Sequence, residues 1–233
     1  MPQVEALAAR HRVILYDHRG TGNSERFVPG ADYAVANLAC DMLAILDGLG
    51  IDKAHIVGHA AGALAALELA RMAAQRVTSL TLVNGWMASG PHFRRCFAIR
   101  RAIYASDGVD GYLRAQPLFL YPADWIDRHL DRLDADCIAH RDGFQDAVTL
   151  HARMAALERF DARDWLGEVS APTLVLWAQD DMLVPPSYGA ALAAGLRAAR
   201  FHAFAWGGHA VNITAPNAFN DVLRQFVEPF TPV

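Results

Sequence analysis

Val57-Gly58-His59-Ala60-Ala61-Gly62 is the stretch that decides the fold of this 233-residue chain. It follows the short apolar run 54–57 and leads into an alanine-rich segment that extends to about residue 73, which predicts a strand turning sharply into a helix. Such a turn requires small residues, and Gly58, Ala61 and Gly62 provide them. In the frame G-x-S-x-G the central serine is a nucleophile, but here the central residue is Ala60.

This turn has two interpretations. As a nucleophile elbow without its nucleophile, it would direct backbone amides of the helix start into a site, where they can hold a developing negative charge. The simpler alternative is a glycine-containing joint between a strand and a helix with no catalytic role. His59 belongs to the same turn, either as part of a site or only as a packing residue.

Strand-like apolar runs alternate with helical patterns along the chain. Strands are predicted at 12–16, 54–57, 80–84 and 173–177, and a shorter β-type run lies at 201–204. A helix ending at Gly50 is indicated by apolar residues at helical spacing, namely Leu38, Met42, Ile45, Leu46 and Leu49. The alternation predicts an α/β fold with a mostly parallel sheet flanked by helices, and functional side chains at the carboxyl ends of its strands.

The segment 86–169 departs from this alternation. It is mainly helical and rich in Trp, Phe, Tyr and Arg, with predicted interruptions at Pro91, Gly108, Gly111, Pro117 and Pro122. We predict a helical cap there, inserted between two parts of the core at 1–85 and 170–233. A cap of this kind covers an active site and excludes water, whereas the alternative is an insertion that only pads the core.

An acid and a histidine follow the elbow in chain order. Asp181 comes directly after the predicted strand 173–177, and His209 follows the run 201–204 in the sequence Gly207-Gly208-His209. The order elbow, acid, histidine is that of a hydrolase triad on a parallel sheet. We therefore predict an Asp181–His209 dyad that moves protons without a covalent nucleophile.

Four further residues are candidates for substrate binding. Asn84 and Trp86 follow the predicted strand 80–84 at the same edge of the sheet. Arg94 and Arg95 stand at the start of the cap, where a guanidinium can hold a carboxylate through two hydrogen bonds. Solvated arginines without a partner are the ordinary alternative. The loop Asp17-His18-Arg19-Gly20 is expected to be structural.

Composition excludes several classes of function. The formal charge of −4 and the lack of a basic block argue against nucleic acid or an acidic membrane as partner. Cys40, Cys96 and Cys137 are odd in number and show no metal-ligand spacing, so we expect neither disulfides nor a metal site, and the predicted chemistry uses no cofactor. We expect a cytoplasmic protein with a small-molecule substrate, and a homodimer is one possible assembly.

These features together resemble the α/β-hydrolase family. Four segments look more specifically like the RutD family of hydrolases from bacterial pyrimidine catabolism: 83–86, 94–97, 115–125 and Gly207-Gly208-His209-Ala210. The resemblance runs from the first residues to about Phe226. It implies that Ala60 is a family trait and that the substrate is a small product of uracil ring opening, either carbamate or 3-aminoacrylate.

The chain departs from this family at its beginning. The family begins with a strand and a glycine-rich loop that supplies half of an oxyanion hole, whereas this sequence opens in a predicted helix at 2–9. The missing strand would lie inside the sheet between the first two strands predicted here, and its loss would leave buried backbone groups unpaired. We therefore expect an N-terminal truncation that results from a start codon placed too far downstream.

Both substrates suit an enzyme that lacks a serine nucleophile. Carbamate decomposes once its nitrogen is protonated, and protonated aminoacrylate is an iminium that water can attack. We expect His209, oriented by Asp181, to transfer the proton, while Ala60 leaves space for water or substrate. The alternatives are a cofactor-free oxygenase or lyase that uses the same dyad, which would need a voluminous pocket, and a non-catalytic binding protein on a hydrolase scaffold.

Overall fold

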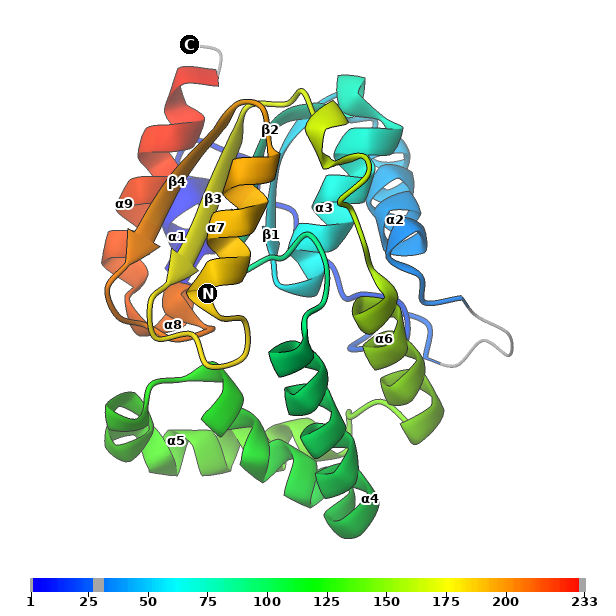
Figure 1. Cartoon of the computed structure of the whole chain (residues 1–233), viewed down its shortest axis with the longest axis vertical. Coiled ribbons are helices and arrows are strands. Elements are labelled where there is room, and N and C mark those ends of the chain that lie inside the picture. The colour runs from blue at the N-terminus through cyan, green and yellow to red at the C-terminus, as the bar shows by residue number, and fades with distance from the viewer. Residues whose placement is uncertain (1, 27–31, 231–233) are drawn as a thin grey trace.

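A parallel sheet forms the centre of the protein. The computed structural model describes residues 2–26 and 32–230, and its sheet has the order β1-β2-β3-β4 (Figure 1). The strands are β1 (Ala54–His59), β2 (Val77–Val83), β3 (Thr173–Ala178) and β4 (Ala199–Phe204), and all neighbours are parallel. The predicted parallel α/β fold is confirmed.

Apolar side chains cover both faces of this sheet. In β3, Leu174 and Leu176 pack with one buried cluster, whereas Val175 and Trp177 pack with another. This alternation follows from the two-residue period of a strand, and a strand buried on both faces is a nearly continuous apolar run. The sheet therefore has no free face at β3, and the buried polar residues Asn84, Asp181 and His209 come after the ends of β2, β3 and β4.

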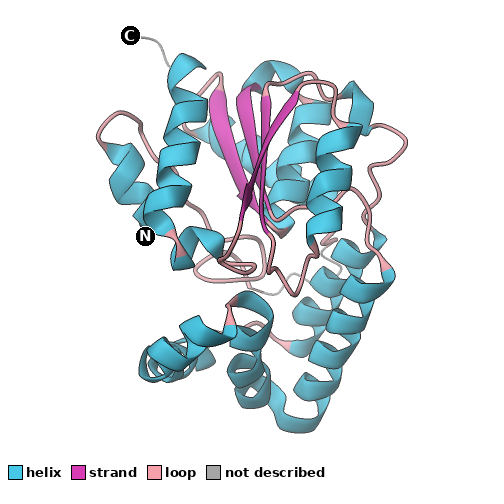
Figure 2. Ribbon diagram, turned by 60° about the vertical axis from the view of Figure 1, so that its left-hand side comes forward, coloured by secondary structure: helices cyan, strands magenta, loops and turns pink. Residues whose placement is uncertain are grey.

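Helices pack on each face (Figure 2). On one face, α3 (Ala61–Met72) contacts β1 and β2, α2 (Val35–Gly48) packs against α3, and α7 (Pro186–Gly195) packs on β3 and β4. On the other face, side chains of α9 join those of β3. The elements here are α1 (Pro2–Ala8), α8 (Val211–Thr214) and α9 (Pro216–Val227). Short 3₁₀ turns lie at Ala74–Arg76, Leu166–Glu168 and Glu228–Phe230.

The predicted strand at 12–16 is not part of the sheet. This segment has no regular secondary structure, and Leu15 within it is 63% exposed. A strand needs a neighbour to accept and donate its backbone hydrogen bonds, and no described segment pairs with 12–16. β1 pairs only with β2, so it forms an edge of the described sheet, where Val57 is also exposed.

Three helices form a separate layer at the carboxyl ends of the strands (Figures 1 and 2). They are α4 (Pro91–Leu120), α5 (Ala123–Arg141) and α6 (Ala147–Arg159). Interruptions predicted at Pro91, Gly108 and Pro122 are found, since α4 begins at Pro91, bends at Gly108 with φ of 65°, and Pro122 precedes α5.

The interruptions predicted at Gly111 and Pro117 are wrong, because both residues lie inside α4. Proline removes one helical hydrogen bond, but tertiary packing supplies most of the stability of a helix in a protein. In this part of α4, Tyr112, Leu113 and Phe119 are buried.

Backbone hydrogen bonds join this layer to the core. Ala88 and Asp161 form an isolated antiparallel bridge, next to which the amide of Ala162 donates to the carbonyl of Met87 at 2.7 Å. At the far end of α4, the carbonyl of Leu120 accepts from the amide of Ala210 at 2.9 Å. The first two contacts hold the start and the end of the insertion together, and the third ties the end of α4 to the residue that follows His209. Among the described helices, none has the length and apolar character needed to cross a bilayer.

The close approach of β1 to α3 gives a testable consequence. A Cβ placed on Gly58 would lie 2.3 Å from the carbonyl oxygen of Gly62, which is backbone and cannot move aside easily. Gly58→Ala should therefore lower the free energy of unfolding by about 1–3 kcal/mol, measured by urea denaturation. Gly62→Ala is the matched control, since a Cβ there meets nothing within 4 Å, and it should be neutral or stabilising by about 0.5–1 kcal/mol. Equal destabilisation by the two variants would contradict this explanation.

Candidate active site

The turn between β1 and α3 has the geometry of a nucleophile elbow. Ala60 is its only residue between the strand and the helix, and its φ of 50° and ψ of −112° are unfavourable for a residue with a side chain. Such strain costs about 1–3 kcal/mol and persists only where surrounding structure imposes it. The surrounding structure here includes the contact of Gly58 with the backbone of α3. A methyl group therefore occupies the place that the sequence frame reserves for a serine.

Backbone groups around Ala60 are arranged for anion binding. The amide of Ala60 donates to the carbonyl of Val83 at 2.9 Å, and the carbonyl of Ala60 accepts from the amides of Ala63 and Leu64. The amides of Ala61 and Gly62, in the first turn of α3, have no acceptor within the helix. These two N–H groups at a helix N-terminus can stabilise negative charge on a bound molecule.

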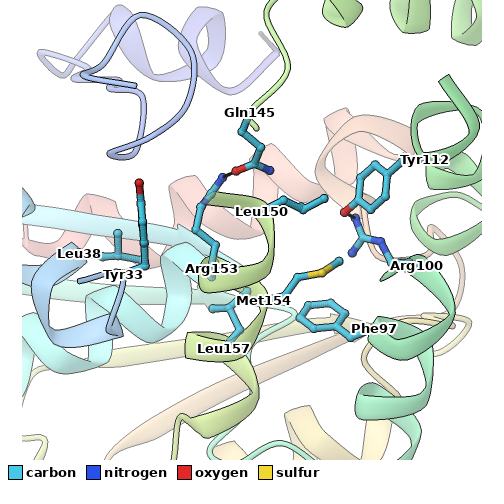
Figure 3. Close-up of a pocket in the computed structure, with 11 residues that line it drawn as sticks. Tyr33, Leu38, Phe97, Arg100, Tyr112, Gln145, Leu150, Arg153, Met154 and Leu157 are labelled. Atoms are coloured by element: carbon cyan, nitrogen blue, oxygen red, sulfur yellow. Dashed lines mark hydrogen bonds between the residues drawn. The ribbon is translucent and has the colours of Figure 1, made fainter. Parts of the chain in front are cut away.

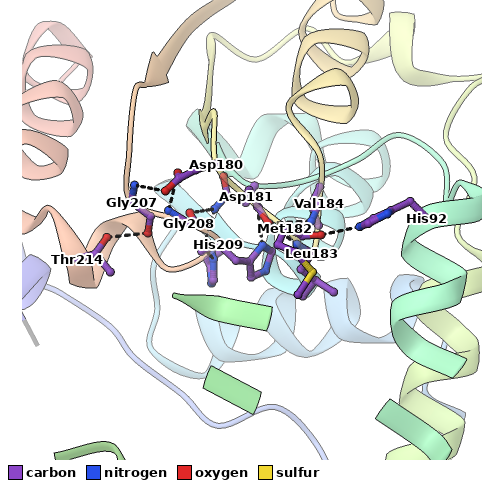
Figure 4. Close-up of polar contacts among 12 residues, drawn as sticks. His92, Asp180, Asp181, Met182, Leu183, Val184, Gly207, Gly208, His209 and Thr214 are labelled. Carbon is purple, nitrogen blue, oxygen red and sulfur yellow. Dashed lines mark hydrogen bonds and ion pairs between the residues drawn. The ribbon is translucent and has the colours of Figure 1, made fainter. Parts of the chain in front are cut away.

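Asp181 and His209 lie in direct contact (Figure 4). Asp181 follows β3 and His209 follows β4, and Oδ2 of Asp181 is 2.8 Å from Nδ1 of His209. The two side chains are 0% and 3% exposed. The proton between them belongs on Nδ1, because the carboxylate is an acceptor, so Nε2 of the neutral imidazole is the free basic atom.

Backbone amides hold the carboxylate of Asp181 in place. Its Oδ1 accepts from the amides of Leu183 at 2.9 Å and Val184 at 2.8 Å. With the bond from His209, this buried carboxylate accepts three hydrogen bonds, which offset the cost of removing it from water. The ring of His209 is therefore directed by a carboxylate that is itself held on both oxygens.

Asp180 has a separate task that sequence reasoning missed. Its two carboxylate oxygens accept from the amides of Gly207 at 3.2 Å and Gly208 at 2.9 Å (Figure 4). Both glycines have positive φ, and a Cβ on Gly208 would meet the carbonyl oxygen of Leu120 at 2.9 Å. The signal in the sequence is the pairing of two adjacent acids with two adjacent glycines before the histidine. Asp180 positions the loop, and Asp181 positions the ring.

His59 and Asn84 both donate to the carbonyl of His209. Nε2 of His59 is 2.7 Å and Nδ2 of Asn84 is 2.5 Å from that oxygen. Asn84 is buried and has a positive φ of 48°. The amide nitrogen of this predicted substrate-binding residue thus holds the backbone of His209, whereas its Oδ1 is buried without a hydrogen-bond partner among the described residues.

The imidazole of His59 lies beside that of His209. The two ring centroids are 4.8 Å apart. The pKa of His59 is lowered to about 4, mainly because the ring is buried among protein atoms and to a smaller extent because His209 lies beside it. His59 is therefore neutral near pH 7 and donates from Nε2. The residue as a whole is nevertheless exposed, so solvent would screen a charge on the ring and the shift contributes little to folding stability.

The other predicted binding residues lie elsewhere. Trp86 is fully buried and packs against Phe93 with ring centroids 4.4 Å apart. Arg94 and Arg95 are exposed on α4, and Arg94 donates to the carbonyl of Ser89. Neither arginine borders the cavity described next.

A cavity of about 150 Å³ lies between the core and the α4 and α6 helices (Figure 3). Ala61 of the elbow borders it, and the cap contributes Arg100 and Arg153. Sequence reasoning missed these two arginines, although helical periodicity could have found them. The residues that share their faces lie three or four positions away: Cys96 and Phe97 for Arg100, and Leu150 and Leu157 for Arg153.

The predicted absence of a metal site remains a sequence-based expectation. Within residues 2–26 and 32–230, no three or more His, Cys, Asp or Glu side chains are grouped in a way that could hold a metal ion. The three cysteines are free thiols, of which Cys40 is exposed and Cys96 buried.

Known proteins resemble this chain in sequence. Residues 1–117 match the family described as the α/β-hydrolase fold. A protein of Caulobacter segnis named "Putative carbamate hydrolase RutD" is 46% identical over 227 residues, which cover 97% of this chain and 85% of that protein. A protein of the same name from Agrobacterium fabrum is 41% identical, over 98% of this chain and 87% of its own length.

Solved structures agree with this assignment. A hydrolase from Pseudomonas aeruginosa superposes with a TM-score of 0.85 at 27% identity, covering 97% of this chain and 83% of that one. The enol-lactonase of Burkholderia xenovorans superposes with a TM-score of 0.86, also at 27% identity, over 97% of this chain and 85% of its own. The chain therefore belongs to the α/β-hydrolase fold family and, within it, to the RutD family.

Proposed function

We propose that this protein hydrolyses a small C–N compound, carbamate or 3-aminoacrylate, by proton transfer through His209 and without a covalent enzyme intermediate. The observation that carries the proposal is Ala60, held in a strained elbow conformation beside a buried Asp–His pair. A scaffold that retains the elbow and the dyad but has a methyl group at its centre keeps acid–base chemistry and gives up nucleophilic attack. The names of the relatives support carbamate as substrate.

For carbamate, the proposed step is protonation of nitrogen. The cation of His209 gives its Nε2 proton to the carbamate nitrogen, the C–N bond breaks, and ammonia and carbon dioxide leave. Asp181 stabilises the imidazolium that exists before this transfer. The imidazole then takes a proton from water to begin the next turnover.

For 3-aminoacrylate, the proposed step is protonation of the carbon next to the carboxylate. The resulting iminium accepts water at the carbon that bears nitrogen, and ammonia then leaves to give a 3-oxo acid. Ala60 leaves room for that water, and α4–α6 act as a cap that limits access of bulk solvent. Either substrate would fit a role in pyrimidine breakdown, and the RutD resemblance supports this proposal.

The size of the cavity bears on the alternative reactions. A volume of about 150 Å³ matches engineered protein cavities of about 150 Å³ that bind benzene, and it is below the roughly 300–1,000 Å³ of ordinary ligand pockets. The voluminous pocket expected of an oxygenase for larger aromatic substrates is not found there. This cavity therefore fits a compact substrate of a few heavy atoms. Ala61 borders it, whereas Asp181 and His209 are not among the residues that line it.

Loss of the dyad should abolish most turnover. His209→Ala is expected to slow ammonia release by ~10²–10⁴-fold, the usual share of general acid–base catalysis. Asp181→Asn should have an effect of similar order, because an amide donor facing Nδ1 favours the wrong imidazole tautomer. His140→Ala, an exposed histidine on α5, is the control. Ammonia is measured with freshly generated aminoacrylate and with carbamate, against a reaction without protein, since both compounds also decompose spontaneously.

An unchanged rate in His209→Ala would reject the proposed mechanism. Ligand binding without any acceleration over the uncatalysed reaction would instead identify a non-catalytic binding protein.

Restoring a hydroxyl at the elbow provides a second test. Ala60→Ser should acquire hydrolysis of p-nitrophenyl acetate with an initial burst of p-nitrophenol, because the dyad can then activate a serine. The same variant should turn over the natural substrate more slowly, since the hydroxyl fills space that water or substrate needs. The double variant Ala60→Ser, His209→Ala is the control and should show no burst. Faster turnover of carbamate or aminoacrylate by Ala60→Ser would contradict a non-covalent mechanism.

A further inference from the structure

We propose that the cavity between the cap and the core is an anion site, in which Arg100 and Arg153 bind the carboxylate-type group of the substrate. The inference deepens the proposed function, because it names which part of a carbamate or aminoacrylate the cap recognises. It also extends to small monocarboxylates that are not substrates.

Arg100 presents a guanidinium that no described carboxylate neutralises. Its Nη2 donates to the hydroxyl of Tyr112, and its Nε is buried without a hydrogen-bond partner in the described part of the chain. A buried charged donor without an acceptor is costly, and native proteins rarely leave one. The side chain lines the cavity, so an anion in the cavity would supply the acceptor (Figure 3).

Aromatic rings hold this cation without cancelling its charge. The guanidinium carbon lies 5.5 Å from the ring centroid of Phe97, 4.9 Å from that of Tyr112 and 5.6 Å from that of Phe119. Cation–π contacts of this kind fix the position of an arginine and leave its N–H groups able to bind an anion.

Arg153 lines the same cavity from α6 (Figure 3). Its Nη1 donates to Oε1 of Gln145 at 2.7 Å, and it forms no ion pair with any described acidic residue. Burial lowers the pKa of both arginines, yet guanidinium remains charged at neutral pH. The cavity therefore carries two positive charges whose described hydrogen-bond partners are a neutral hydroxyl and a neutral amide.

Other arginines of the cap behave differently. Arg101, which follows Arg100 in the sequence, makes two hydrogen bonds to Glu158, at 3.0 and 2.7 Å. Exposed arginines of α5 pair with Asp124 and Asp110. Several cap arginines outside the cavity thus have an acidic partner, while the two arginines that line the cavity have none among the described residues. This distribution favours a site built for a negatively charged ligand.

The cavity extends from the two positively charged arginines to the elbow. Ala61 and the two arginines border one cavity of about 150 Å³, so a molecule of a few heavy atoms can reach from one to the other. With its carboxylate at the arginines, the substrate would have its other end near the elbow. Neutral molecules of the same shape would lack the charge-assisted hydrogen bonds that secure this orientation.

Propionate and propionamide test this site without turnover. They are similar in size and differ in charge, and ligand-induced stabilisation is measured as the rise in Tm with concentration. Propionate should raise the Tm of the wild type, and propionamide should not. Arg100→Met should weaken propionate binding roughly 10–100-fold, and Arg153→Met should weaken it in the same direction. Arg95→Met, an exposed arginine on the same helix, is the control and should bind as the wild type does.

Kinetics then separate this site from the catalytic proposal. Because the carboxylate of 3-aminoacrylate does not react, the anion contact acts on its ground state and transition state alike, and the arginine variants should raise KM for this substrate much more than they lower kcat. His209→Ala should keep propionate binding while it loses turnover. Equal stabilisation by propionate and propionamide, or unchanged propionate binding in both arginine variants, would overturn the anion site whatever the fate of the proposed reaction. Turnover that survives in His209→Ala would refute the reaction and leave the anion site standing.

Discussion

The contact between Gly58 and the backbone of α3 is the constraint on which the site depends. Because no side chain separates β1 from the first turn of the helix, the chain reverses within one residue. Ala60 is thereby forced to positive φ, and His59 comes to donate to the carbonyl of His209. Strain at the elbow and one contact to the backbone of His209 thus accompany this close backbone approach, which the remaining packing stabilises.

Two neighbouring carboxylates position His209 and the loop that carries it. Asp180 holds the amides of the glycine loop, while Asp181 holds the imidazole that this loop presents. The cap contributes as well, since the carbonyl of Leu120 accepts from the amide of Ala210, the residue after His209. A movement of the cap would therefore shift the backbone next to His209 through this single hydrogen bond. This connection gives the cap a physical link to the dyad in addition to covering the site.

Much of this arrangement could be predicted from local patterns. Strand periodicity and glycine spacing predicted the elbow, and the order of motifs predicted that an acid and a histidine would meet at the strand ends. The predicted strand at 12–16 and the predicted helix breaks at Gly111 and Pro117 were wrong, because these features depend on residues that are distant in the sequence. The segment 12–16 has strand composition but no neighbouring strand, and both Gly111 and Pro117 are tolerated inside α4 by its packing. Arg94 and Arg95 were chosen for their chemistry alone, whereas helical phase places Arg100 toward the cavity.

The sequence by itself determined the fold class and the missing hydroxyl, because hydrophobic periodicity and residue identity at a turn are local properties. It also predicted that Asp181 and His209 would meet, through their order along a parallel sheet. Only the tertiary structure decided that Asn84 and His59 support His209, and that Arg100 and Arg153 share a cavity with the elbow. These relations join residues from different elements, and their geometry follows from how helices and strands pack, which no single segment of the chain encodes.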